Sequence, residues 1–594
     1  MGKREDIRSK LTHLGERSRL RLSAAEAELL LSGLGVLAGL LAGLVILAFR
    51  SLVEGVQGAM LPGHGENYEG LPPLARLLLP IAGALLIALY LRFVARKASV
   101  TGVPHVMNRV AYHQGYLPWQ NAVTQFVCGA LAIISGQPVG REGPSVHLGA
   151  ASASQLGQKL GLPNNSMRIL VASGTAAAIA ASFNTPLAGV AFAMEVVVMD
   201  YSIAGFLPVI LAAVTATVLV QLVYGASPAF HVPPLDPIGL IDLPQVIVAG
   251  VLMGVLAAAF IRLMKLCIRL GRRNGPSLRL LAAGLIAGLA GLLLPQVMAI
   301  GYDTVSATIA GQLGWALLLG LTAAKLLSTA FVLGMGVPAG LIGPTIFIGA
   351  VAGGALGHAA GWAAPEAAAS PTLYALIGMG AMMGATLRAP LAALTALLEL
   401  TGNPTIIFPG MLAVAAATLT ASELFKEDSI FFMQLRAQGL ETRRTALLQG
   451  FDRVGVARVM DRRLAVLPRR LARARLHAAL AESPRWILIE EAEKVFLIPV
   501  TDVLNFLERE ADVEDVDLLE VPAQRLQAAP IELRATLREA LLALRRESAE
   551  ALCVVQTNAP GLRRYYGVVM RQDIDSQYLL SSSRSESPAR PLDD

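Results

Sequence analysis

Residues 110–422 carry very little charge for their length. They include only 19 Asp, Glu, Lys or Arg residues, whereas residues 423–594 include 52. The first stretch cannot form the solvated surface of a soluble domain, in which about 25% of residues are charged. The whole chain is 54% hydrophobic and 15% charged. The fold class predicted from this split is a polytopic α-helical membrane protein followed by a water-soluble domain with its own core.

The charge distribution also predicts the domain boundaries. Basic residues precede a charge-free run at Leu29–Phe49, which is long enough to span a bilayer. Cys128, Cys267 and Cys553 lie far apart and predict neither a disulfide framework nor a metal site. We expect a cytoplasmic segment at 1–28, a membrane domain at 29–440 with halves at about 29–225 and 241–422, a soluble domain at 450–580, and a disordered tail at 581–594.

An internal repeat relates the two halves of the membrane domain. Gly136–Ala150 matches Gly336–Ala350 at seven of fifteen positions. A second pair of motifs follows in the same order, each with a proline and a glutamate nine residues later, at Glu195 and Glu399. Chance similarity between Gly-rich segments does not account well for two matched pairs in one order. The membrane domain is therefore predicted to be a duplication.

Basic residues predict that the two halves have opposite orientations. The first span follows a basic segment, which should remain in the cytoplasm. The first span of the second half, about Ile241–Ile261, is instead followed by a basic cluster that begins at Arg262. Frequent Gly and Pro residues also predict broken helices. An inverted repeat of broken helices is a transporter architecture with its ion site near the membrane midplane.

Each copy of the glycine-proline motif predicts a helix start. Proline is tolerated in the first helical turn, and the preceding glycines leave backbone N–H groups accessible to an anion. The first copy has Arg141 and Glu142 where the second has Leu341 and Ile342. An ionised Glu142 could occupy the anion site and leave it when protonated. The alternative is a structural role in a local pair with Arg141 or as a helix cap. Glu195 and Glu399 are expected to tie helix ends to neighbouring backbone.

These motifs resemble those of the CLC chloride channels and chloride/proton exchangers. The Gly140–Pro144 segment resembles the gating-glutamate motif of that family, Val100–Pro104 resembles its first anion motif, and Gly340–Pro344 resembles its second. The resemblance covers about residues 25–440. It implies a two-half inverted repeat of tilted helices that forms a homodimer with one anion pathway per subunit. It also implies a multi-pass protein of the cell (inner) membrane with both termini in the cytoplasm, acting on chloride or a similar anion and on protons.

The resemblance assigns site residues position by position. Glu142 matches the external gate, and Thr101 stands at the place of a family serine. Phe431 replaces a common tyrosine, so a hydroxyl donor is lost. Val196 stands where proton-coupled members often have an inner glutamate. The residues implied for anion binding are Thr101, Gly102, Arg141, Gly143, Leu341, Ile342 and Phe431, with no metal ligands.

Val196 favours a passive, glutamate-gated chloride channel because valine cannot carry a proton. The alternative is a proton-coupled exchanger of chloride or another anion. The fluoride and nitrate branches of the family depart differently at the position of Thr101, so chloride is the expected substrate. A distant alternative is an intramembrane hydrolase, for which Ser145 and His147 form the one candidate pair. The expected class is a transport protein and not an enzyme.

The soluble tail contains two similar α/β units, Val456–Leu507 and Leu526–Leu580. It resembles the tandem CBS domain that many CLC proteins carry. The family's nucleotide signature is only partly present: Gly567 and Asp573 fit, but Met570 does not, and Phe496 and Pro499 depart around Asp502. A structural or dimer-stabilising tail without a cofactor is therefore expected. An adenine-nucleotide sensor is the alternative.

Overall fold

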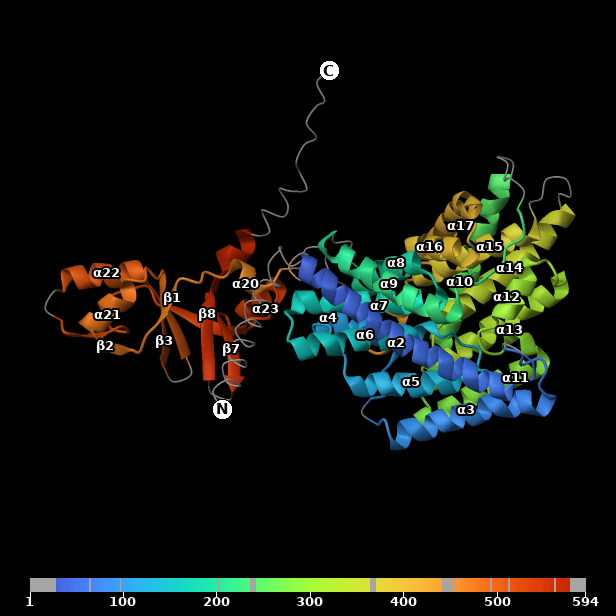
Figure 1. The fold of residues 1–594 in the computed structure, drawn as a ribbon, viewed down its shortest axis with the longest axis horizontal. Coiled ribbons are helices and arrows are strands. Elements are labelled where there is room, and N and C mark those ends of the chain that lie inside the picture. Colours follow the sequence, from blue (N-terminus) through green and yellow to red (C-terminus); the bar gives the residue numbers. More distant parts are fainter. Residues whose placement is uncertain are drawn as a thin grey trace, which may run out of the picture. The chain divides into compact units, whose positions relative to one another are not determined.

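The computed structural model describes residues 28–63, 66–96, 98–199, 203–235, 242–363, 370–440, 451, 454–491, 494–510, 513–559 and 562–576. The expected N-terminal segment, apart from Glu28, and the expected disordered tail lie outside these residues. The chain forms two compact units: a membrane unit of residues 28–160 and 167–442, and a C-terminal unit of the residues from 443 onward, with which residues 161–166 are grouped. Figure 1 labels the elements of both.

The first half of the membrane unit consists of helices of very different lengths. Long helices alternate with short ones, and a π-helical turn, η2, extends α8. This half contains α2 (Glu28–Met60), α3 (Pro73–Phe93), α4 (Gly102–Tyr112), α5 (Trp119–Ile134), α6 (Glu142–Leu160), α7 (Asn164–Phe183), α8 (Pro186–Phe192), η2 (Ala193–Val198) and α9 (Ile203–Tyr224).

The second half repeats this order of elements. It ends in a second π-helical turn, η6, and the short helix α18. It contains α10 (Leu243–Gly271), α11 (Pro276–Leu293), η4 (Pro295–Val297), α12 (Tyr302–Ile309), α13 (Trp315–Gly334), α14 (Ile342–Ala363), α15 (Pro371–Leu387), α16 (Pro390–Thr401), η5 (Pro404–Ile406), α17 (Ile407–Leu419), η6 (Thr420–Leu424) and α18 (Ile430–Ala437).

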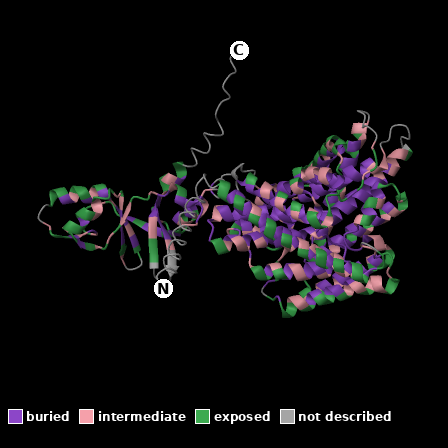
Figure 2. Cartoon of the chain, viewed as in Figure 1, coloured by how far each residue is buried: buried purple, intermediate pink, exposed green. Residues whose placement is uncertain are grey.

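Large apolar side chains cover the outside of this unit. Leu29, Leu222 and Leu293 are each at least 80% exposed, which is compatible with lipid and not with water. Among the described residues, nine helices are long and apolar enough to cross a membrane. Figure 2 shows buried residues through the interior of the unit and exposed ones on its outer faces. The unit is therefore a polytopic helical membrane domain, as predicted.

Contacts between helices repeat across the two halves. The first and last helices of each half pack together, α2 with α9 and α10 with α17. A Cβ added to Gly39 would lie 2.5 Å from the Ala212 carbonyl oxygen, and one added to Gly250 would lie 2.6 Å from that of Ala413. Small residues thus let both pairs approach closely. Equivalent helices also meet across the halves, α3 with α11 and α8 with α16. These reciprocal contacts confirm the duplication.

The first spans of both halves are longer than expected. The apolar run predicted at Leu29–Phe49 continues to Met60 as part of α2. The span predicted to end at Ile261 continues to Gly271, so the first residues of the basic cluster lie inside α10. Arg262 and Lys265 both pair there with Glu427, which offsets one of their two charges at the end of the span.

The C-terminal unit contains two similar α/β repeats joined through one sheet. The six-stranded sheet has the order β1-β3-β4-β6-β7-β8. In each repeat the first strand is parallel to the second and the second is antiparallel to the third. The strands are β1 (Leu464–Val466), β2 (Arg470–Ala472), β3 (Trp486–Glu491), β4 (Lys494–Pro499), β5 (Asp515–Asp517), β6 (Leu526–Glu532), β7 (Ala551–Ala559) and β8 (Leu562–Met570).

Helices complete both repeats of this unit. The helices are α20 (Val456–Val459), α21 (Arg473–Leu480), α22 (Val500–Arg509) and α23 (Leu537–Arg546). Separate hydrophobic clusters form around Leu476 in the first repeat and around Leu537 in the second. The two α/β units predicted from the sequence are therefore present.

Candidate functional site

The two glycine-proline motifs meet in the interior of the membrane unit. Gly140 and Gly340 form an antiparallel bridge in which each amide donates to the other's carbonyl oxygen, both at 2.8 Å. Helices α6 and α14 begin two residues later, at Glu142 and Ile342. The sequence predicted both helix starts but not the bridge between them. Two helix N-termini, each with positive partial charge, therefore converge on one place.

Side chains from neighbouring helices hold this junction in a symmetric way. Gln125 Nε2 on α5 donates to the Pro338 carbonyl oxygen at 2.8 Å. Thr329 Oγ1 on α13 donates to the Pro138 carbonyl oxygen, also at 2.8 Å. Each half of the domain thus fixes the motif of the other half. The carbonyl groups of Pro138 and Pro338 are thereby satisfied next to the two helix starts.

The carboxyl group of Glu142 lies within this junction. The residue is fully buried, no side chain among the described residues hydrogen-bonds its carboxyl group, and the backbone amides of Glu142 and Gly343 act on it. A Cβ added to Gly140, Gly340 or Gly343 would lie 1.9, 2.7 or 2.8 Å from one of these oxygens. The glycines therefore form the walls of the space that the carboxyl group fills. A buried carboxyl group without a basic partner in a membrane domain is costly and indicates a functional role.

Arg141 does not form the local pair with Glu142 that the sequence allowed. Its Nη1 lies 3.6 Å from Glu54 Oε1, and its guanidinium carbon lies 5.3 Å and 5.7 Å from the ring centroids of Phe183 and Tyr302. This places Arg141 beside the gate residue but outside the lining of the cavity described next. It is the one predicted anion-binding residue that does not border that cavity.

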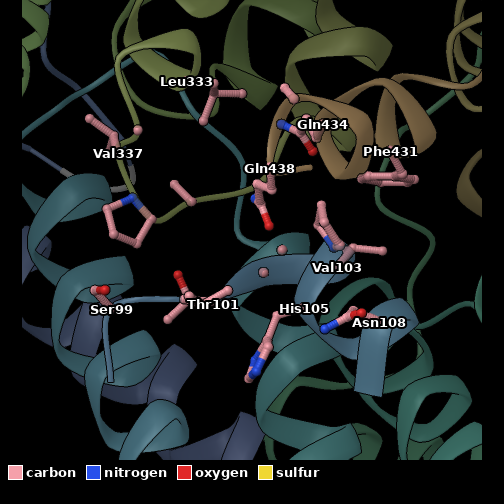
Figure 3. Close-up of a pocket in the computed structure, with 18 of the residues that line it drawn as sticks. Ser99, Thr101, Val103, His105, Asn108, Leu333, Val337, Phe431, Gln434 and Gln438 are labelled. Atoms are coloured by element: carbon pink, nitrogen blue, oxygen red, sulfur yellow. The ribbon is translucent and has the colours of Figure 1, made fainter. Parts of the chain in front are cut away.

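A cavity of about 870 Å³ leads to the junction. The other six predicted anion-binding residues all border it, namely Thr101, Gly102, Gly143, Leu341, Ile342 and Phe431. Thr101 precedes α4, and Gly102 opens that helix with a φ of 82°, which favours glycine. Figure 3 shows the Thr101 side chain across the cavity from α18. Segments far apart in the sequence therefore form one space beside the gate.

Phe431 borders the cavity from α18. It is only 2% exposed, and its ring contacts Phe192 edge-on with 6.3 Å between centroids. Gln434 and Gln438 also face the cavity from this segment (Figure 3). The wall formed by α18 and the residues after it thus has an apolar ring at the position where the family pattern has a hydroxyl donor. Two amide side chains lie beside this ring.

Three arginines that the sequence analysis did not place at the site also border the cavity. They are Arg109 on α4, Arg272 just after α10, and Arg279 on α11. Clustered positive charge at the edge of a cavity raises the local concentration of anions. The sequence signalled Arg272 and Arg279 only as part of a basic cluster that sets orientation. Their position beside the cavity depends on how α10 and α11 pack.

Glu195 and Glu399 cap helix N-termini reciprocally. The Glu399 carboxylate accepts from the Leu187 and Ala188 amides at 2.9 and 2.8 Å, where α8 begins. The Glu195 carboxylate accepts from the Leu391 and Ala392 amides at 3.3 and 2.8 Å, where α16 begins. Their predicted structural role is confirmed.

Val196 lies in η2, next to Glu195. It is 5% exposed and does not border the cavity. Its side chain has no atom that can hold or transfer a proton. Among the described residues, no group of three or more His, Cys, Asp or Glu side chains could hold a metal ion.

Comparisons with known proteins agree with this geometry. The model of the voltage gated chloride channel family matches residues 82–422, which is more than half of the chain. This chain belongs to the voltage gated chloride channel family. The family consists of transport proteins, so the membrane unit transports chloride and the chain is not an enzyme. The hydrolase alternative is thereby set aside.

Individual relatives match over most of the membrane unit. A ClcB-like protein of Ralstonia nicotianae is 31% identical over 394 residues, covering 65% of this chain and 92% of its own. The H(+)/Cl(-) exchange transporter ClcA of Vibrio cholerae is 29% identical over 408 residues, covering 66% and 86%. The crystal structure of a slow cyanobacterial Cl-/H+ antiporter has a TM-score of 0.62 and 24% identity, covering 69% and 97%. This last similarity shows the CLC fold.

Proposed function

We propose that this protein exchanges chloride for protons across a membrane, with Glu142 as both the gate and the proton carrier. The observation that carries the proposal is the buried Glu142 carboxyl group between the N-termini of α6 and α14, where the backbone amides of Glu142 and Gly343 act on it. When ionised, it takes the place that an anion would occupy there. When protonated, it loses its attraction to the helix N-termini and leaves that place to chloride. Chloride and protons therefore move in alternation.

A passive channel is the second candidate, and Val196 is the observation that favours it. The sequence alone slightly favoured a passive channel over an exchanger. The relationship to the ClcA exchange transporter shifts the balance to exchange, because that relative exchanges chloride for protons and matches 66% of this chain. Glu142 itself supports exchange, since it presents a protonatable group inside the anion site.

The remaining site residues receive proposed roles from their positions. The amides at the start of α14, at Leu341 and Ile342, and the α6 amide of Gly143 replace water around the anion. Thr101 adds a hydroxyl donor from the start of α4. Phe431 leaves its side of the cavity apolar. Arg141 acts from beside the gate, where its charge attracts anions.

Two measurements on one reconstituted sample test the proposal. Proteoliposomes loaded with chloride and made permeable to K⁺ are diluted into low chloride, and both external chloride and external pH are recorded. An exchanger moves protons uphill during chloride efflux. The Glu142→Gln variant mimics the protonated gate, so it should keep chloride flux and lose proton movement. Chloride efflux by wild type without any proton movement would instead establish the passive channel.

We propose that the protein works as a homodimer in the cell (inner) membrane, with both termini in the cytoplasm and lipid around its outer helices. Helices α8, α9, α16 and α17 form one continuous surface, since α8 packs against α9 and α16, and α16 packs against α17. Leu187 on α8 and Leu391 on α16 are 55% and 46% exposed on equivalent helices. This apolar, internally symmetric surface suits a two-fold interface. The basic residues after the first span of the second half support the orientation.

We propose that the C-terminal unit is a structural tandem CBS domain without a resident cofactor. The two acids that could bind a nucleotide ribose are already engaged with backbone amides. Asp573 Oδ2 accepts from the Met570 amide at 2.8 Å, and Asp502 Oδ2 accepts from the Gln524 amide at 3.1 Å. An adenine nucleotide would have to displace both contacts. The domain boundaries given above remain predictions.

A further inference from the structure

A pair of histidines connects the cavity to α6, the helix that begins at Glu142. His105 on α4 and His147 on α6 are hydrogen-bonded through His105 Nδ1 and His147 Nε2 at 2.8 Å. His105 is 6% exposed, and His147 is fully buried. In Figure 3 the His105 imidazole leaves α4 on the side away from Phe431 and Gln438. Two imidazoles joined in this way provide four ring nitrogens in one chain of proton donors and acceptors.

The two ends of this pair differ in their surroundings. His105 is among the residues that border the cavity, so it can exchange protons with water there. At the other end, His147 Nδ1 is buried and has no hydrogen-bond partner among the described residues. A buried ring nitrogen without a partner is unusual, because leaving it unpaired costs about 1–3 kcal/mol. A histidine pair that served only to pack α4 against α6 would not need a buried ring nitrogen without a partner.

The unpaired nitrogen belongs to the helix that carries the gate. His147 follows Glu142 by five residues, which is a rise of about 7.5 Å along α6. Gln125 lies beside the turn between them, since a Cβ added to Gly129 would lie 2.7 Å from Pro144 Cγ and 3.4 Å from Gln125 Nε2. Gln125 Oε1 also has no partner among the described residues. Buried polar atoms of this kind can pair with internal water, and the rise of about 7.5 Å requires a chain of at least two water molecules between His147 and Glu142.

We propose that His105 and His147 form a proton relay between the cavity and Glu142. Val196, at the position where a carboxylate could fill this role, has none. The inference rests on the exchange function proposed above. In one transfer, a proton from cavity water binds His105 Nε2, the Nδ1 proton of His105 passes to His147 Nε2, and His147 Nδ1 releases its proton through water to the Glu142 carboxylate. One proton enters and one leaves, and both imidazoles end in the other neutral tautomer. Before the next transfer each ring must lose its Nε2 proton and gain one on Nδ1 by exchange with water, since rotation of a ring does not change which nitrogen carries the proton.

Titratable groups around the relay come from five neighbouring elements and from its own helices. Arg109 on α4 and His113 just after it act electrostatically on His105, and His105 acts on His147. Of the two carboxylates on neighbouring elements, Glu195 is bound by α16 amides and Glu54 by Arg50. The titratable groups on the helices that pack against α4 and α6 are Arg50 and Glu54 on α2, Cys128 on α5, Glu195 on η2, His358 on α14 and Arg436 on α18.

Paired chloride and proton fluxes of histidine variants test the relay. His147→Gln retains a polar side chain of similar size but cannot pass a proton. We expect it to reduce proton movement at least tenfold while chloride flux stays within about twofold of wild type. His105→Gln should have the same effect, which guards against a folding defect in one variant. His231→Gln is the matched control, because His231 is an exposed histidine that lies outside α4 and α6 and does not border the cavity, and it should leave the coupling unchanged.

The outcomes separate this inference from the proposed function. If wild type pumps protons and both His147→Gln and His105→Gln keep the wild-type ratio of protons to chloride, the relay is wrong and exchange stands. If wild type moves chloride without protons, exchange itself fails and the relay fails with it. Equal loss of chloride and proton flux in both variants would assign the pair a structural role and reject the relay.

Discussion

At the scale of single residues, the site depends on two glycines that have no side chain. Gly143 and Gly340 have no Cβ where the two motifs cross. A Cβ on Gly143 would lie 2.8 Å from the Ala339 carbonyl oxygen, and one on Gly340 would lie 2.5 Å from the Gly143 amide nitrogen. Both contacts involve backbone, which cannot move aside without separating the helix starts.

Gly340→Ala should therefore reduce chloride flux more than tenfold. The added methyl group forces the two helix N-termini apart and lengthens the amide contacts to the anion. Chloride efflux from proteoliposomes measures the effect. Gly33→Ala on α2 is the control, because nothing lies within 4 Å of its added Cβ. Flux in Gly340→Ala equal to that of the control would show that the close crossing of the motifs is unimportant.

Phe431→Tyr should increase the apparent affinity for chloride. Phe431 borders the cavity, and a hydroxyl group on its ring could donate a hydrogen bond to an anion there. A net contribution of about 0.5–1.5 kcal/mol corresponds to roughly 2- to 10-fold tighter binding. The chloride dependence of flux gives this value. Phe192→Tyr serves for comparison, since Phe192 is buried against Phe431 but does not border the cavity. An unchanged affinity in Phe431→Tyr would place the anion away from α18.

At the scale of elements, the short helices α8 and α16 are each capped at the N-terminus by a glutamate of the opposite half. The proline-led starts of α8 and α16 could be predicted, and so could the structural role of their glutamates. That each glutamate caps the other half's helix could not be predicted, because it depends on α8 and α16 packing together. The free N-termini of α6 and α14 differ from these capped ones, which explains why only the former can receive an anion.

Glu195→Ala and Glu399→Ala should destabilise the membrane unit by similar amounts. Each variant leaves two amides at a helix start without their acceptor, which costs about 1–2 kcal/mol. Thermal unfolding in detergent should show a midpoint lower by a few degrees for each. Glu423→Ala removes a glutamate that pairs only with its neighbours Ser422 and Lys426 and should have no effect. If only one of the two buried variants were destabilised, the reciprocal capping would not be equivalent in energy.

The antiparallel pair of β2 and β5 predicts a pH dependence in the C-terminal unit. Hydrogen bonds from Arg469, at 3.0 Å, and from Arg470, at 2.9 Å, lower the pKa of Asp517 from 3.8 to about 2. Because the pKa is depressed in the folded state, the stabilisation is complete above about pH 4 and is lost as the pH falls towards 2.

Asp517→Asn should therefore lower the stability of the C-terminal unit at neutral pH. The difference from wild type should be constant from pH 7 to 5 and shrink below pH 4. Calorimetry of the full-length protein at several pH values measures it. Asp575→Asn changes an exposed aspartate of the same unit and serves as the control. A difference that persisted unchanged to pH 2.5 would show that the charge of Asp517 is not its cause.

At the scale of the whole molecule, much of the account follows from a duplicated sequence. The repeat predicted two halves, opposed helix starts and Glu142 between them, because those features are local in each motif. The cavity could not be predicted in full. Arg109, Arg272 and Arg279 reach it through the packing of α4, α10 and α11, and the sequence showed two of them only as part of a basic cluster. The lengths of α2 and α10 were also underestimated, since charges near a span's end are tolerated when they are paired.

The central claim is that the Glu142 carboxyl group occupies a place that an anion otherwise takes between α6 and α14. Anomalous diffraction from crystals of wild type and Glu142→Gln grown in bromide tests it most directly. The account predicts a bromide peak at the converging helix N-termini in the variant and none at that place in wild type. A peak of equal height there in both proteins, or in neither, would contradict it.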